Sequence, residues 1–289
     1  MNKKIGPYHI VDLPPARQEV SNFLELYWWK HCMYGLLEVD VTVAKQFIEA
    51  YKARTGELLS FTGYLVFCLA RAIDEDKSVQ AYLKGRKQLV VFDNVDVGMT
   101  IERRVDGTKA VMGHIVRVAN HKTYREIHQE IRAVQAKPVP PYKGYKPWFR
   151  TAMTLPWPLS RLFVTLMRVA IRRDPSIFVS MGGTVCVTAV GMFGEGQGGW
   201  GVVPLPFTLG LVVGSTAWKP AGVGGRIELR EILNLTVVFD HDVIDGAPAA
   251  RFARRLVELI ESGYGLDEDL PTLATINDFA AAREAAVEA

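Results

Sequence analysis

The segment that ends in Phe252 constrains the fold of this chain more than any other. A run rich in Val, Leu and Ile from Ile232 to Phe239 predicts a buried strand. A helix is predicted shortly after it, because Pro248 suits a first helical turn and apolar residues then recur at helical spacing up to Gly263. The chain must therefore turn from a strand directly into a helix.

The turn itself carries groups suited to acid–base chemistry. His241 follows the strand, Asp245 lies four residues later, and Gly246 can adopt backbone angles that other residues avoid. A histidine held at the junction of two rigid elements can act as a general base near neutral pH. The alternative is a core histidine bonded to a neighbouring Asp, and the three fixed residues of His-x-x-x-Asp-Gly do not decide between the two.

The longer string from Phe239 to Phe252 closely resembles the active-site segment of the dihydrolipoamide acyltransferases, the core enzymes of 2-oxo acid dehydrogenase complexes. Their pattern is Asp-His-Arg-x-x-Asp-Gly followed by an Ala-rich helix start. Chloramphenicol acetyltransferases share the fold and the His-x-x-x-Asp-Gly core. Four further segments resemble the family in the same order, namely 37–42, 95–101, 182–194 and 209–214. The chain is identified as a member of this superfamily over about residues 17–262.

The resemblance implies a chloramphenicol acetyltransferase-like α/β fold, in which helices cover a mixed central sheet. The 289 residues are enough for one large core, so we expect a single domain over residues 1–289. The local patterns agree. Strands are predicted at 34–41, 88–92, 95–101, 109–118, 184–190, 209–217 and 232–239, and helices at 43–54, 61–73 and, after a capping box formed by Thr123 and Glu126, to about 135. A short surface helix is expected from Thr272 on.

The resemblance also implies a chemistry, which is acyl transfer between coenzyme A and a thiol. By analogy with the matching positions of the family, His241 is expected to be the general base that forms the thiolate, and the Thr188 hydroxyl is expected to stabilise the tetrahedral oxyanion. The alternative for Thr188 is an ordinary β-branched strand residue. Asp245 has a mainly structural role in the family, through an ion pair whose partner here is expected to be Arg17.

The chain departs from the family at several places. Asp242 stands where Arg is usual, and Ala189 where Asn or Ser is usual. Ahead of residue 17 there is no lipoyl domain, subunit-binding domain or long Ala/Pro linker, so no lipoyl group is expected on this chain and a separate carrier would have to dock. Three interpretations therefore stay open: an acyltransferase, a catalytically inactive docking core on the same fold, and a small-molecule O-acetyltransferase. The retained site residues favour catalysis.

Assembly, location and metal content can be stated as expectations. In the superfamily the active site lies between subunits of a trimer, so a homotrimer or larger homo-oligomer is implied, with the His from one chain and the hydroxyl from its neighbour. The three cysteines lack ligand spacing, which indicates buried thiols of a reducing cytoplasm and no metal site. Neither a signal peptide nor an apolar run of about 20 residues is present. No nucleic acid partner is expected.

A basic insertion at about 137–173 breaks the family pattern. It holds eight Lys or Arg and no acid, while the chain as a whole carries +3. Its second half, 158–173, predicts an amphipathic helix with basic residues on one face and apolar residues elsewhere. The basic face suggests an acidic lipoyl or other carrier protein, or guarding of the cofactor entrance. An anionic membrane surface, with peripheral location, is the alternative, and a solvated face on a packed helix is the third.

Overall fold

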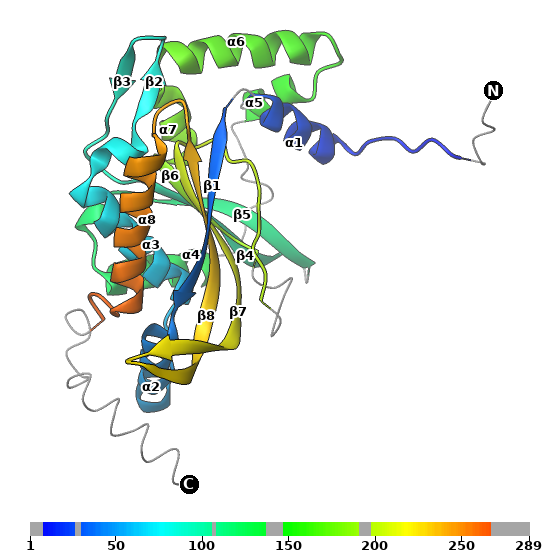
Figure 1. The fold of residues 1–289 in the computed structure, drawn as a ribbon. Coiled ribbons are helices and arrows are strands. Elements are labelled where there is room, and N and C mark those ends of the chain that lie inside the picture. Colours follow the sequence, from blue (N-terminus) through cyan, green and yellow to red (C-terminus); the bar gives the residue numbers. More distant parts are fainter. Residues whose placement is uncertain (1–7, 27–29, 106–107, 137–146, 191–197, 267–289) are drawn as a thin grey trace, which may run out of the picture.

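The computed structural model of the protein describes residues 8–26, 30–105, 108–136, 147–190 and 198–266, which are built around one mixed sheet (Figure 1). The sheet has six strands in the order β1-β8-β7-β6-β4-β5. Strand β6 is parallel to both of its neighbours, and the other neighbours are antiparallel. The strands are β1 Cys32–Asp40, β4 Val97–Val105, β5 Thr108–Val116, β6 Val185–Ala189, β7 Leu209–Val223 and β8 Arg226–Asp240. The predicted mixed α/β architecture is confirmed.

Helices cover one face of this sheet and one of its ends. Helices α3 and α8 pack against each other, α4 packs against α3, and together with the sheet they enclose the main core. Helices α1, α5, α6 and α7 gather at the end of the sheet where β8 stops (Figure 1). The helices are α1 Pro15–Glu25, α2 Thr42–Thr55, α3 Phe61–Glu75, α4 Tyr124–Ala136, α5 Pro147–Met153, α6 Leu159–Arg173, α7 Ser176–Gly182 and α8 Gly246–Glu261.

Alternation along the strands sorts their side chains between the two faces of the sheet. In β7, Leu209 and Leu211 point into the main core, as Leu235 and Val237 do in β8. Cys186 of β6 instead joins a second apolar cluster on the other face, with residues of α5, α6 and α7. Burial of both sets of apolar side chains provides the main driving force for folding.

Local sequence signals explain where several helices begin. The predicted capping box opens α4, since the Thr123 amide donates to Glu126 Oε2 at 2.8 Å and the Glu126 amide donates to Thr123 Oγ1 at 3.2 Å. The hydroxyl of Ser60 accepts from the Gly63 amide at the start of α3. These bonds satisfy amide groups that the first turn of a helix leaves without a partner.

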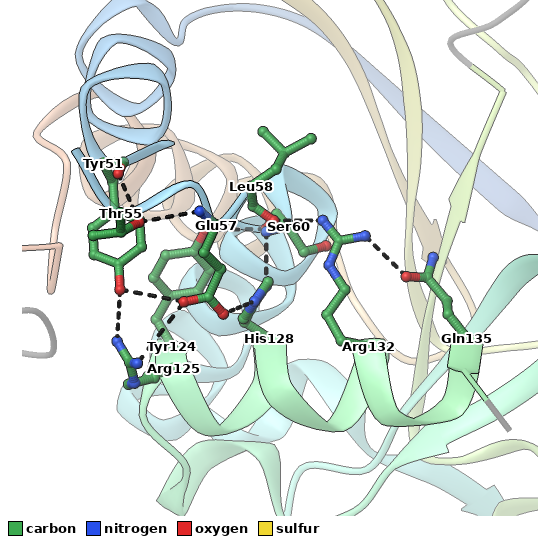
Figure 2. Close-up of polar contacts among 10 residues, drawn as sticks. All are labelled: Tyr51, Thr55, Glu57, Leu58, Ser60, Tyr124, Arg125, His128, Arg132 and Gln135. Atoms are coloured by element: carbon green, nitrogen blue, oxygen red, sulfur yellow. Dashed lines mark hydrogen bonds and ion pairs between the residues drawn. The ribbon is translucent and has the colours of Figure 1, made fainter. Parts of the chain in front are cut away.

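A buried histidine joins α4 to the start of α3 (Figure 2). The Ser60 amide donates to His128 Nδ1 at 3.0 Å, so the proton lies on Nε2, which donates to Glu57 Oε1 at 3.0 Å. Burial lowers the pKa of His128, and the ring is therefore held neutral in one tautomer.

Several elements differ from the sequence prediction. Strands β7 and β8 are longer than expected and form one hairpin. The predicted strand at 88–92 is only Gln88–Val90, and it pairs with the unpredicted β2, Tyr82–Lys84, in a separate small sheet. Within the basic insertion, the helix at 159–173 is confirmed, whereas residues 137–146 and the helix expected from Thr272 lie outside the described residues. The single-domain arrangement stays a prediction. None of the described helices has the length and apolar character needed to cross a membrane.

Candidate active site

His241 lies where β8 turns into α8, as the sequence predicted. Strand β8 ends at Asp240 and α8 begins at Gly246. The His241 amide donates to the carbonyl of His31 at 2.8 Å, and the Ala249 amide donates to the Asp245 carbonyl in the first turn of the helix. The backbone on both sides of His241 is therefore fixed by hydrogen bonds.

The imidazole of His241 is open to solvent rather than packed in the core. Its side chain is 50% exposed, and its Nδ1 lies 3.9 Å from Asp245 Oδ1, whose side chain is 88% exposed. That distance allows an ion pair but is too long for a hydrogen bond, and such an exposed pair contributes little to stability. The alternative of a buried core histidine is wrong, so His241 can reach a substrate.

Two side-chain contacts flank His241 that sequence reasoning missed. Lys30 pairs with Asp240, and their side chains are only 6% and 2% exposed. His31 Nδ1 lies 2.8 Å from Asp242 Oδ1 at the surface. The residues before and after His241 are thus both held by the segment that leads into β1. The one available signal was Asp242, which stands where the family usually has Arg.

Two expectations about the turn need correction. Gly246 has no positive φ, and a Cβ added there would meet no atom within 4 Å, so the turn does not depend on glycine's backbone freedom. Arg17 lies exposed on α1, which packs against α5 and α6. Among the ion pairs of the described residues, Asp245 is joined to His241 and not to Arg17. The expected pair is therefore absent within one chain.

Thr188 lies on β6 with its side chain on the face opposite the main core. Val185 and Val187 belong to the main core, and Thr188 shares the other face with Cys186. It is partly exposed, whereas the three residues before it are buried. A hydroxyl in this position is accessible from outside the chain.

A single chain does not bring Thr188 and His241 together. Thr188 is paired with Val212 of β7, which is paired with Thr236 of β8, and His241 follows five residues later. The two residues are two strands apart, at about 4.8 Å per strand, and five residues apart along the strand direction, at about 3.4 Å per residue. Their backbones are therefore separated by roughly 20 Å. One substrate atom cannot contact both side chains of the same chain.

A groove runs along the side of the sheet next to the buried Lys30. Its volume is about 390 Å³, and it is lined by Phe23, Leu24, Lys30, Cys32, Tyr34, Pro204, Leu205 and Pro206. Cys32 is in register with Asp240, the residue before His241, so the groove opens close to the candidate base. In the described part of the chain, no cluster of three or more His, Cys, Asp or Glu is arranged to hold a metal ion.

Comparison with solved structures defines the class of fold. A probable dihydrolipoamide acetyltransferase from Listeria monocytogenes has a TM-score of 0.63 and 20% identity, covering 90% of this chain and 96% of that one. A structure described as the cubic core of the pyruvate dehydrogenase multienzyme complex has a TM-score of 0.63 and 18% identity, covering 91% and 98%. The predicted acyltransferase fold is confirmed.

Sequence comparison adds the family. Residues 179–266 match the model of the 2-oxoacid dehydrogenases acyltransferase (catalytic domain). The succinyltransferase component of the mitochondrial 2-oxoglutarate dehydrogenase complex of Sus scrofa is 30% identical over 223 residues, which are 77% of this chain and 41% of that protein. The predicted resemblance is confirmed, and the chain is related to these catalytic domains. It spans less than half the length of the curated relatives that it matches.

Proposed function

We propose that this chain is an acyltransferase that moves an acyl group between coenzyme A and a thiol, with a dihydrolipoyl group as the leading acceptor. The observation that carries the proposal is the accessible imidazole of His241, held at the β8–α8 junction inside the segment that matches the catalytic-domain model. An accessible histidine in a fixed backbone has the properties of a general base.

The proposed reaction balances protons without a further reagent. His241 takes the proton of the attacking thiol, and the resulting thiolate adds to the thioester carbonyl. The Thr188 hydroxyl donates to the oxyanion of the tetrahedral intermediate. When the intermediate collapses, the leaving thiolate takes the proton back from the imidazolium. Asp245 Oδ1 lies 3.9 Å from His241 Nδ1, beside the ring that carries the proton in this step.

The site is proposed to form between subunits of a homotrimer. The separation of about 20 Å between Thr188 and His241 within one chain supports this arrangement, since each residue then meets its counterpart from a neighbour. The similarity to a multienzyme core structure agrees with a homo-oligomer. Coenzyme A is a substrate in this scheme, and a separate acidic lipoyl or carrier protein is the proposed source of the thiol. The three cysteines are free thiols, which supports a reducing compartment such as the cytoplasm.

The proposal is tested by measuring acyl transfer from acetyl- or succinyl-coenzyme A to dihydrolipoamide and to a free lipoyl domain. We expect His241→Ala to lower the rate by at least about 10²-fold while the fold is kept, because the general base is lost. Thr188→Val should cause a smaller loss, through one missing oxyanion donor. The control is His9→Ala, at an exposed histidine far along the chain from the site.

Turnover of His241→Ala at the parental rate would refute the assigned base. A Thr188→Val variant as fast as the parent would make Thr188 an ordinary strand residue. If the parental protein transferred acyl groups only to hydroxyl compounds, the acceptor would be a small-molecule hydroxyl compound and not a thiol.

A further inference from the structure

Helix α6 has two apolar faces, of which only one packs on the protein. Phe163, Val164, Met167 and Ile171 belong to the second apolar cluster. On the other side of the helix four aliphatic side chains remain between 44 and 60% exposed, namely Leu159, Leu162, Leu166 and Val169. The sequence pattern placed these residues away from the basic face, and the structure adds that they do not pack on the protein.

The four exposed side chains form one continuous stripe. Their spacing of three, four and three residues places them on the same side of a helix along its whole length. Trp157, which is 74% exposed, precedes the helix and adds an aromatic ring near its start. In Figure 1, α6 lies along the end of the molecule, at its outer boundary. We call these four aliphatic residues, together with Trp157, the outer face of α6.

Positive charges border the stripe. Arg161 and Arg172 are exposed and lie about 100° around the helix from it, and Arg173 is exposed at its C-terminal end. The helix contains no acidic residue. This combination of an exposed apolar stripe, a basic border and a neighbouring tryptophan is the pattern of helices that lie in the membrane interface.

We propose that the outer face of α6 docks this protein on an anionic membrane surface. The aliphatic side chains enter the boundary between headgroups and acyl chains, and the arginines contact the lipid phosphates. An acidic carrier protein would account for the arginines but would leave four exposed aliphatic side chains without an apolar environment. A second copy of the same face would set arginine against arginine. The inner face stays packed on the protein, so α6 lies on the membrane and does not cross it.

Docking by α6 would also bring the candidate site close to the lipid surface. Arg172 lines a small cavity together with Lys30 and Asp240, the ion pair that precedes His241. The end of the sheet that carries His241 is therefore the end that faces the membrane. The docking proposal does not depend on the chemistry of acyl transfer.

The test is co-sedimentation of the full chain with vesicles of phosphatidylcholine, with and without phosphatidylglycerol. We expect binding only to the anionic vesicles, and weaker binding as salt rises. Leu162→Glu with Leu166→Glu, and separately Arg161→Glu with Arg173→Glu, should each lower the vesicle partition coefficient by at least about tenfold. Acyl transfer to a soluble thiol should be unchanged in both variants, because none of these residues belongs to the proposed site.

Matched controls carry the same chemical changes on other surfaces. Ile227→Glu with Leu229→Glu alters exposed aliphatic residues at the far end of the β7–β8 hairpin, and Arg54→Glu with Arg226→Glu reverses two exposed arginines elsewhere. Both controls should bind vesicles as the parent does.

Three results would overturn the proposal. The first is no binding of the parent to anionic vesicles, and the second is an equal loss of binding in the controls. The third is dissociation of the parental oligomer by Leu162→Glu with Leu166→Glu, which would make the outer face a contact between copies of the chain. Loss of acyl transfer in His241→Ala with intact vesicle binding would separate the two proposals.

Discussion

At the residue scale, the buried pair of Lys30 and Asp240 is the most consequential contact near the candidate site. Asp240 also accepts from the Asp242 amide at 3.2 Å, so its carboxylate helps to shape the turn that carries His241. A charge this deeply buried requires its partner, because the interior solvates ions poorly. The pair therefore acts as a positioning element for His241.

We predict that Lys30→Met lowers the free energy of unfolding by about 3–5 kcal/mol, because it leaves the buried Asp240 carboxylate without its cation. The double variant Lys30→Met with Asp240→Leu should recover much of that stability but not the catalytic rate. Urea unfolding measures the first effect and steady-state kinetics the second. The control Lys45→Met breaks a more exposed pair with Glu231 and should cost less than about 1 kcal/mol. Equal losses in Lys30→Met and Lys45→Met would contradict the prediction.

At the element scale, the contact between α3 and α4 depends on a neutral histidine. His128 accepts from Ser60 through Nδ1, and a proton added at Nδ1 would remove that bond and place a charge in a buried site (Figure 2). Because its folded-state pKa is lowered, the unfolded chain binds this proton more readily. The stabilisation is thus complete above the unfolded-state pKa of about 6.5 and is lost as the pH falls towards the lower folded-state pKa.

We predict that urea unfolding of the parent shows a free energy that declines as the pH is lowered below about 6.5, and that His128→Gln removes part of this slope. The variant should also be less stable at neutral pH by about 1–3 kcal/mol, through imperfect replacement of two buried hydrogen bonds. His9→Gln, at an exposed position, should keep the parental slope. An unchanged slope in His128→Gln would show that other groups cause the acid sensitivity.

The elements also show where sequence patterns succeed and where they fail. The capping box at Thr123 and the apolar run of α3 are local signals, and the structure follows both. Short elements such as α7, with seven residues, and β2, with three, offer too few residues for a periodic pattern and were missed. Periodicity predicted α6 but could not tell which apolar side chains meet the protein. In the site, His241 was predicted from its motif, whereas Lys30 was not, because 210 residues separate it from Asp240.

At the scale of the whole molecule, the separation of Thr188 and His241 makes a prediction about mixed assemblies. If every site combines two chains, His241→Ala and Thr188→Val chains assembled together should form some sites in which both residues are intact. Random mixing of equal amounts should restore about one quarter of the sites. Co-expression of differently tagged chains, followed by purification of the mixed oligomer and an acyl-transfer assay, measures this. Absence of any recovery in confirmed mixed oligomers would show that Thr188 and His241 do not act in a shared site.

The same separation has a genetic consequence. If the protein is the proposed homotrimer, a chain that lacks both Thr188 and His241 but still assembles would inactivate the site it shares with each of its two neighbours. Equal expression of such a chain and the parental one would leave about one quarter of the activity rather than one half. Such a variant would then act as a dominant-negative chain wherever it is expressed together with the parental one, provided that it still folds.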